Sequence, residues 1–255
     1  MKNWIVNRVF DYAIDKERTE AYLAWIKANV SGKTVVELGA GSGIMTWLCI
    51  KHGATHVYAY ENNVRVINWL KTLFKNETKV TIIEKDVTTA TLQAADIYLH
   101  ENFGSNVYME DILGLYTNLK AQNLEDKTFP NKLKMQYGTY DISNNTDISG
   151  ADRYAEIDDA DLVEFFAACP MDEISPGFLP QRQVDESKVT INGTLFDGDL
   201  KDLTQFTASD TNGELVFWEA TFDGKHTLSN WKSKTSWNTI PIDIVCLLYT
   251  SAAAD

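Results

Sequence analysis

The chain has 255 residues, 44% hydrophobic and 23% charged, which suits a globular protein of one large domain or two modest ones. Its formal net charge of −13, with no cluster of Lys and Arg, argues against a nucleic-acid binder, because phosphate contacts need such clusters. No apolar run approaches the ~20 residues of a membrane helix, the N-terminus lacks a signal-peptide core, and three scattered cysteines form neither a disulfide framework nor a metal site.

The first predicted element is an amphipathic helix over residues 15–29, with Asp15 at or near its N-cap. Arg18, Tyr22 and Trp25 are spaced at i, i+4 and i+7, so they share one stripe of the helix. The stripe fits a helix packed on the core with Arg18 at its rim. Composition alone favours that interpretation, and the alternative is a helix that directs Arg18 into the glycine site.

Residues 34–43, T-V-V-E-L-G-A-G-S-G, predict a buried strand, a tight turn and the start of a helix. The glycines at 39, 41 and 43 tolerate positive φ and let a ligand lie against bare backbone. The helix that follows offers unpaired N–H groups and a favourable dipole to an anionic group. The stretch therefore predicts a nucleotide-type cofactor site.

Strands and helices then alternate, which is typical of a parallel sheet with helices on both faces. We expect helices over 44–52 and 64–74 and strands over 56–60, 79–83 and 96–99. In such sheets the ligand lies at the carboxyl ends of the strands. Four acids fall there: Glu37, Glu61, Asp86 and Glu101.

Beyond residue 130 the pattern changes to short alternating segments separated by Asn, Asp and Gly, which predicts strands joined by turns. One helix is expected over 158–169. We therefore divide the chain into an α/β domain, residues 1–129, and a β-rich domain, residues 130–255.

Two motifs indicate which cofactor and which chemistry. A dinucleotide fingerprint needs glycine at position 44, where the chain has Ile44. The pattern E-x-G-x-G-x-G, beginning at Glu37, instead resembles motif I of class I S-adenosylmethionine (SAM) methyltransferases. The segment E-N-F-G-S-N-V-Y-M-E, from Glu101 to Glu110, resembles the double-glutamate loop of protein arginine methyltransferases. D-K-E-R-T (15–19), F-P-N-K (129–132) and S-N-W (229–231) match further family motifs in the family's order.

The resemblance implies a Rossmann-like methyltransferase domain followed by a β-barrel-type substrate domain, with SAM as cofactor. Arg18 would bind the methionine carboxylate, and Glu61 the ribose hydroxyls, at a suitable 22 residues from Gly39. The remaining cofactor residues on this reading are Glu37, Gly39, Gly41, Asp86 and Val87. No metal is implied.

Glu101 and Glu110 would be the catalytic pair. A guanidinium is protonated at neutral pH and spreads its charge over three nitrogens, so each is a poor nucleophile. Two carboxylates hold the cation, draw its charge away from the reacting nitrogen and aim that nitrogen at the methyl group. The expected substrate is therefore an arginine-containing protein or peptide.

The chain also departs from the family. Asn102 and Ser105 replace two aromatic residues of the loop, and Asn230 replaces a histidine that in the family pairs with an aspartate, here Asp15. We expect Asn230 to hydrogen-bond Asp15 without carrying a proton, beside Trp231 of the same motif. His100 is expected to play a structural role.

Two alternatives remain open: a methyltransferase of a small guanidino or amine compound, and a non-catalytic SAM-binding protein. The resemblance implies a homodimer docked through residues 156–169, although the acids of that insert fit a dry interface poorly. A reducing intracellular location, cytoplasm or nucleus, follows from the cysteine usage. Residues 246–255 resemble translated adapter sequence, which would mean that the native chain continues and that the last barrel strands are absent here. The alternative is an ordinary frayed terminus.

Overall fold

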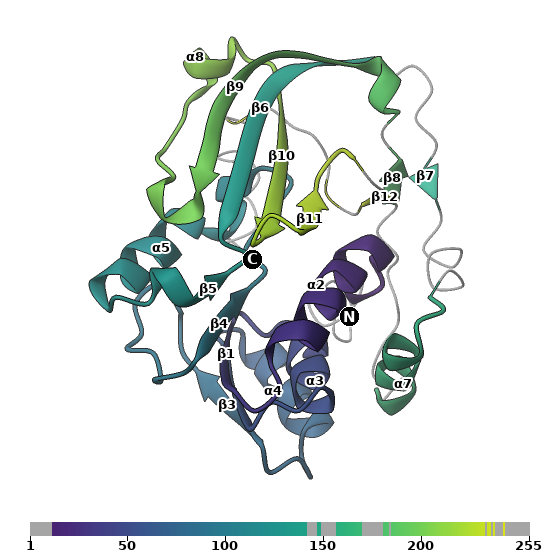
Figure 1. The fold of residues 1–255 in the computed structure, drawn as a ribbon, viewed down its shortest axis with the longest axis vertical. Helices are drawn as coiled ribbons and strands as arrows, with labels where there is room; N and C mark the ends of the chain where they lie inside the picture. Colours follow the sequence, from purple (N-terminus) through teal and green to yellow (C-terminus); the bar gives the residue numbers. More distant parts are fainter. Residues whose placement is uncertain are drawn as a thin grey trace.

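The computed structural model describes residues 12–141, 147–148, 157–169, 181–183, 185–232, 234–235, 237 and 242, with only the backbone of 147–148, 181–183 and 234–235. Two lobes are stacked along the long axis of the molecule: an α/β lobe below and an antiparallel lobe above (Figure 1). The terminal residues 246–255 and most of the segment 9–13 lie outside the described part of the chain.

The lower lobe is built on a parallel sheet of strand order β3-β2-β1-β4-β5. The strands are β1 (Thr34–Leu38), β2 (His56–Glu61), β3 (Val80–Glu84), β4 (Ile97–His100) and β5 (Thr128–Phe129). β2, β3 and β4 were expected from the sequence to within one residue at each end, and β1 was expected within residues 34–43. The two-residue β5 was not expected. The central strand β1 is apolar and buried beyond its first residue, as a parallel strand covered on both faces must be.

Four helices accompany this sheet: α2 (Lys16–Asn29), α3 (Ile44–Lys51), α4 (Val64–Leu73) and α5 (Ile112–Ala121). Asp15 caps α2 by accepting a hydrogen bond from the backbone N–H of Arg18 at 3.5 Å. Asn63 caps α4 in the same way through Arg65. A side-chain acceptor at this position satisfies a backbone donor that the helix itself leaves unpaired.

The turn between β1 and α3 requires its glycines. Gly39 and Gly43 have φ of 92° and 85°, a left-handed region that a side chain rarely adopts. A Cβ on Gly43 would also lie 2.9 Å from carbons of Leu70 and Phe74. The turn is held against the neighbouring strand because the N–H groups of Gly39 and Ala40 both donate to the carbonyl of Tyr60.

The upper lobe contains a four-stranded antiparallel sheet of order β11-β10-β6-β9. Its strands are β6 (Lys132–Tyr140), β9 (Val189–Asp199), β10 (Leu215–Phe222) and β11 (His226–Ser229). A smaller sheet joins β7 (Asp147–Ile148), β8 (Gln181–Gln183) and β12 (Lys234–Thr235). Short helices complete the described chain: η1 (Val107–Glu110), η2 (Glu125–Lys127), η4 (Glu186–Lys188), η5 (Leu200–Asp202) and α8 (Ala208–Thr211). The predicted class, a parallel α/β domain followed by an antiparallel one, is confirmed.

Helix α2 joins the two lobes. The ring of Trp25 lies 4.7 Å from that of Phe129, at the end of β5, and 5.5 Å from that of Phe222, at the end of β10. Tyr22 packs edge-on against Phe222 at 4.9 Å. The proposed domain boundary at 129/130 falls in this junction, where a cis peptide links Phe129 to Pro130.

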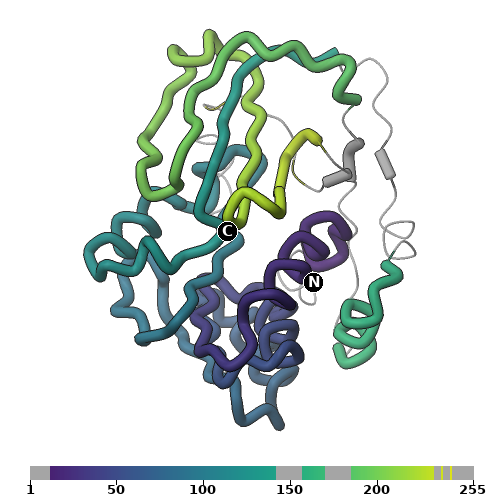
Figure 2. The backbone as a smooth tube through the Cα atoms, in the orientation of Figure 1, coloured from purple at the N-terminus to yellow at the C-terminus, as the bar shows by residue number. Residues whose placement is uncertain are grey.

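Helix α7 (Ala160–Ala168) confirms the helix expected over 158–169, and it packs beside the lower lobe of its own chain (Figure 2). Phe165 contacts Trp47 of α3 edge-on, with ring centroids 6.0 Å apart. Asp161 lies 2.9 Å from Nζ of Lys27 and 3.1 Å from Nζ of Lys51. In this contact, basic side chains of the lower lobe of the same chain face the acids of the segment.

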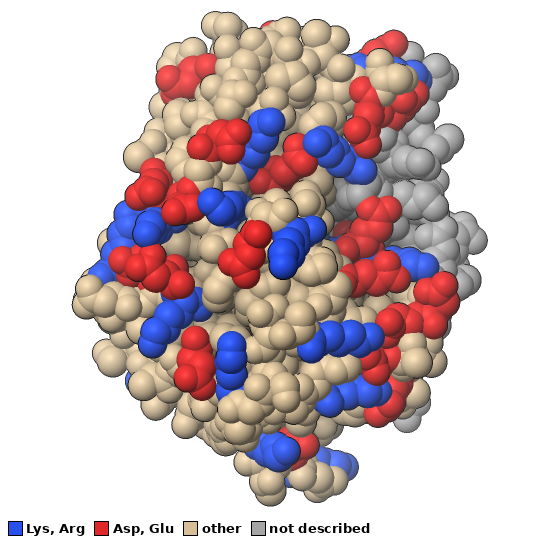
Figure 3. All heavy atoms as spheres, in the orientation of Figure 1, with Lys and Arg blue, Asp and Glu red and all other residues tan. Residues whose placement is uncertain are grey.

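Charged side chains of both signs are interspersed over the face drawn in Figure 3. Among the described residues, no helix is long and apolar enough to cross a membrane. The same part of the chain holds no cluster of three or more His, Cys, Asp or Glu able to bind a metal ion.

Candidate functional site

A cavity of about 640 Å³ opens where β1, β2, β3 and β4 end, a size typical of small-molecule sites. The predicted cofactor residues all line it: Arg18, Glu37, Gly39, Gly41, Glu61, Asp86 and Val87. The predicted catalytic pair, Glu101 and Glu110, lines the same cavity. Residues that are 92 positions apart in the chain, from 18 to 110, are thus gathered around one space.

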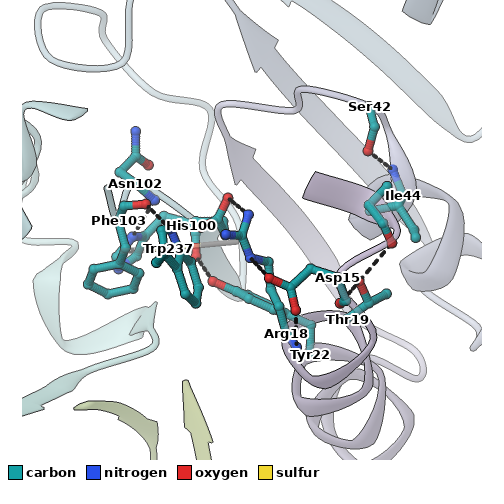
Figure 4. Close-up of polar contacts among 12 residues, drawn as sticks. Asp15, Arg18, Thr19, Tyr22, Ser42, Ile44, His100, Asn102, Phe103 and Trp237 are labelled. Atoms are coloured by element: carbon teal, nitrogen blue, oxygen red, sulfur yellow. Dashed lines mark hydrogen bonds and ion pairs between the residues drawn. The ribbon is translucent and has the colours of Figure 1, made fainter. Parts of the chain in front are cut away.

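Arg18 is buried at one end of this cavity, with 4% of its surface exposed. Its Nη1 lies 3.3 Å from Oε2 of Glu101, and its Nε lies 3.8 Å from Oδ2 of Asp15. The ring of Trp237 covers the guanidinium at 3.6 Å from Cζ. Figure 4 shows Arg18 with Asp15 on one side of it and Trp237 and His100 on the other. Arg18 therefore lies at the cavity wall, as the second reading of its helix expected.

Glu101 follows β4 directly, and its carboxylate is only half satisfied. Oε2 pairs with Arg18, whereas Oε1 is buried and has no hydrogen-bond donor among the described residues. Burial raises the pKa of Glu101 to about 8, and the charge of Glu110 adds to this while Arg18 opposes it. A buried acceptor without a donor is costly, so the site favours a ligand that brings N–H groups and positive charge.

Glu110 ends the 3-10 helix η1, and the loop before it folds back sharply to bring it there. Asn106 caps η1 by accepting from the N–H of Tyr108 at 3.1 Å. A Cβ on Gly104 would lie 2.4 Å from Cβ of Met109, so only glycine allows the fold of the loop. The glycine three positions after Glu101 therefore lets both glutamates face one cavity.

Glu61 holds the end of β2 to the glycine turn. Its Oε2 accepts from the N–H of Gly41 at 3.1 Å, and its Oε1 accepts from the N–H groups of Asn62 and Asn63 at 3.0 and 2.9 Å. The carboxylate is therefore fixed at the cavity wall, where its lone pairs can also accept from hydroxyl groups of a ligand.

Glu37 is buried, with 4% of its surface exposed, and accepts a short hydrogen bond from the hydroxyl of Thr46 on α3. Burial raises the pKa of Glu37 to about 8, with a smaller contribution from the charge of Glu61. The carboxyl of Glu37 is therefore largely neutral at pH 7, which suits a buried side chain that links β1 to α3 through Thr46.

Asp86 and Val87 follow β3 at the far end of the cavity. Asp86 Oδ1 accepts from the backbone N–H and the hydroxyl of Thr88, at 2.8 and 2.7 Å, and these bonds hold the pKa of Asp86 below its usual value. Val87 is buried, and its carbonyl accepts from Nδ2 of Asn118 at 2.7 Å. An ionised acid and an apolar surface thus lie side by side. Such a pair can bind a heteroaromatic ring, because the acid accepts from an amine on the ring and the apolar surface packs against its face.

The expected bond between Asn230 and Asp15 is wrong. The buried amide of Asn230 accepts from the N–H of Trp218 at 2.8 Å and donates to the carbonyls of Ser105 and Val216 at 3.2 and 3.0 Å. An amide can satisfy one donor and two acceptors of the surrounding backbone at once, which an imidazole cannot. Asn230 thus ties the strand β10 to the glutamate loop.

Trp231 does not line the cavity. It is buried against Phe217 of β10, with ring centroids 5.4 Å apart. Its place is in the upper lobe beside Asn230, where it packs the sheet.

His100 has the structural role that its sequence context suggested. It is buried, its Nδ1 accepts from the N–H of Asn102 at 3.4 Å, and its Nε2 lies 3.2 Å from the carbonyl of Pro130. Burial lowers the pKa of His100 to about 4. The neutral ring therefore connects β4 to the junction between the lobes.

Asn102, which replaces an aromatic residue of the family's loop, lines the cavity, and its Oδ1 is buried with no donor among the residues described. A side chain at the site that the sequence pattern did not indicate is Trp237. Trp237 covers Arg18, yet it lies six positions beyond the S-N-W motif, where no spacing rule points to it. Only its aromatic character, in a segment rich in Ser, Thr and Lys, marks it in the sequence.

No family model matches the chain. Among curated proteins, a ribosomal protein arginine N-methyltransferase of Schizosaccharomyces pombe is 30% identical over 106 residues, covering 39% of this chain and 20% of that protein. A probable histone-arginine methyltransferase of Arabidopsis thaliana is 34% identical over 125 residues, 46% of this chain and 23% of that protein. The matched segments thus span about a fifth of these relatives.

The fold is shared over a greater length. A chain of the Trypanosoma brucei PRMT1 enzyme-prozyme heterotetrameric complex with AdoHcy aligns with 90% of this chain and 79% of its own length. The TM-score is 0.61 at 19% sequence identity. The likeness therefore covers both lobes and not only the segments matched by sequence.

Proposed function

We propose that this chain, which belongs to the protein arginine N-methyltransferase family, transfers a methyl group from SAM to a guanidino nitrogen of an arginine side chain. One observation carries the proposal. In a cavity that also contains Glu110, one carboxylate oxygen of Glu101 pairs with Arg18, and the other is buried with no donor in the described part of the chain.

The lining of the cavity fits the cofactor. SAM supplies a methyl group on a positively charged sulfur, a carboxylate, ribose hydroxyls and an adenine ring. Arg18 would pair with the carboxylate, and Gly39 and Gly41 would lie along the methionyl part. Glu61 would accept from the ribose hydroxyls, and Glu37 would hold the glycine turn from below.

The adenine would lie at the other end of the cavity, against Asp86 and Val87. Asp86 keeps its negative charge because its pKa is lowered, so it accepts from the exocyclic amine. Val87 is apolar and buried beside it.

Glu101 and Glu110 would hold the acceptor. Their carboxylates attract the guanidinium, accept from the nitrogens that do not react, and leave the third nitrogen directed at the methyl group. Bringing the two reactants together in this way contributes several kcal/mol, within an upper range of about 7–11 kcal/mol.

Glu101 would also take the proton that the methylated nitrogen releases. A general base works best when its pKa lies near the working pH, and the pKa of Glu101 is raised to about 8. His100 is not suited to this step, since it is absent from the cavity lining and both ring nitrogens face main-chain groups.

The direct test is transfer of labelled methyl from SAM to Gly/Arg-rich peptides by the purified chain. Labelled arginine, identified by mass spectrometry of the peptide, is the expected result. A second function, methylation of a small guanidino or amine compound, is favoured by the polar side chain of Asn102 at the cavity. Turnover of free arginine or a metabolite extract, with peptides untouched, would decide for it.

A homodimer and an intracellular location complete the proposal. The family resemblance supports the dimer, whereas the packing of α7 on its own chain offers a way to fill the same surface without a partner. Light scattering of the chain with residues 156–169 replaced by a short linker tests this. An unchanged mass would exclude the segment as the dimer contact.

A further inference from the structure

Four consecutive residues of the glutamate loop are hydrogen-bonded to the second half of the chain. Three loop carbonyls accept from side chains: Phe103 O from Trp237 Nε1 at 2.7 Å, Gly104 O from Trp218 Nε1 at 3.2 Å, and Ser105 O from Asn230 Nδ2 at 3.2 Å. The fourth residue, Asn106, donates through its side-chain Nδ2 to the carbonyl of Ile242 at 2.9 Å. These bonds fix the backbone between the two glutamates. The acceptor side of the site is therefore positioned by the upper lobe.

Trp237 differs from the other three because it also touches the cofactor side. The face of its ring lies 3.6 Å from Cζ of Arg18, and the side chain is buried, with 4% of its surface exposed. Trp218 packs edge-on against the same ring, with centroids 4.7 Å apart. Figure 4 shows Trp237 between Arg18 and Phe103.

The two contacts use different parts of the indole. The edge N–H binds the loop, and the electron-rich face attracts the guanidinium. A cation–π contact occupies none of the five N–H donors of Arg18. The contact with the ring therefore does not compete with the ion pair between Nη1 of Arg18 and Oε2 of Glu101.

We propose that Trp237 is a positioning residue that couples the two halves of the site. Its ring face holds Arg18 for the methyl donor, and its N–H holds the loop of Glu101 for the acceptor. The inference rests on the proposed function. It adds a residue outside every motif that pointed to that function.

Substitutions separate the two contacts. Trp237→Phe keeps an aromatic face over Arg18 and removes the N–H, so SAM should bind within about 3-fold of wild type while kcat/KM for a Gly/Arg-rich peptide falls about 10-fold. Trp237→Met removes both contacts and keeps an apolar side chain. SAM binding should then weaken roughly 5- to 30-fold, the range of a desolvated cation–π contact.

Trp218→Phe is the matched control. It removes the neighbouring N–H bond, to Gly104, and Trp218 is not among the rings over Arg18. It should lower kcat/KM for the peptide with SAM affinity unchanged. Calorimetry gives the SAM affinity, a filter assay gives the transfer rate, and thermal unfolding shows that each variant is folded.

Equal SAM affinity in Trp237→Met and wild type would overturn the inference. So would equal loss in Trp237→Phe and Trp237→Met, because a purely structural role would not distinguish an aromatic face from an aliphatic chain. If the predicted order of SAM affinities is found and no peptide is methylated, the proposed acceptor is wrong and the contact of Trp237 with the cofactor arginine stands.

Discussion

Nη1 of Arg18 lies 3.3 Å from Oε2 of Glu101, so a helix near the start of the chain is paired with the end of β4. Both side chains line one cavity, which contains the proposed sites of the methyl donor and of the methyl acceptor. Once Glu101 is ionised, the pair neutralises two charges that would otherwise be costly to bury. A carboxylate brought by the cofactor would share Arg18 with Glu101.

Arg18→Ala should weaken SAM binding by at least 10-fold, because the buried charge that receives the methionine carboxylate is lost. Arg18→Lys should recover only part of it, since an ammonium lacks the planar fork of a guanidinium. Calorimetry with SAM measures both. Arg65→Ala, at an exposed position of α4 that does not line the cavity, is the control. Equal affinities in Arg65→Ala and Arg18→Ala would contradict the assignment.

The rate of methyl transfer should rise with pH through the neutral range. Because the pKa of Glu101 is raised to about 8, its carboxyl is largely protonated at pH 6.5 and becomes the charged clamp only at higher pH. A plot of kcat/KM against pH should therefore climb with a midpoint near pH 8 and level off only about one pH unit higher. A flat profile between pH 6 and 9 would show that the ionisation of Glu101 does not limit the reaction.

Glu37 should make the folded protein less stable as pH rises. Its pKa is raised from 4.5 to about 8, so between these values the folded chain keeps a proton that the unfolded chain has lost. The free energy of unfolding then falls across that window. Relative to wild type, Glu37→Gln should gain about 2–4 kcal/mol between pH 5.5 and 8.5. Urea unfolding at the two pH values measures this, and parallel curves would refute it.

Asn230→Ala should destabilise the fold by about 2–4 kcal/mol, because it leaves the buried N–H of Trp218 and two carbonyls without partners. Asn192→Ala is a matched control at the surface, where the amide binds Glu214, and should cost less than about 0.5 kcal/mol. Chemical denaturation compares the two. Similar costs would mean that the amide of Asn230 contributes little.

Much of the lower lobe could be predicted from the sequence because its signals are local. The glycines after Glu37 need positive φ, and the acids after each strand must meet at one edge of a parallel sheet. The glutamate loop could also be recognised, because its glycine is part of the sequence motif. In the structure Gly104 is required there, since a side chain would collide with Met109.

The contacts between the lobes could not be predicted in this way. Asn230 was expected at Asp15 by analogy with a histidine, yet its amide binds main-chain groups of the upper lobe and the loop. The position of Trp237 over Arg18 depends on how the last described segment returns to the site. No periodicity encodes such a long-range contact.

The measurement that tests the central claim most directly is methyl transfer by Glu101→Gln and Glu110→Gln, with SAM binding measured on the same preparations. Glu84→Gln, an exposed acid at the end of β3 outside the cavity, is the control. The account predicts that both cavity variants lose at least 100-fold in kcat/KM, because the charge that clamps the guanidinium is removed. Both should still bind SAM within a few fold of wild type, and Glu84→Gln should stay active. Transfer to peptide arginine at the wild-type rate by either cavity variant would contradict it.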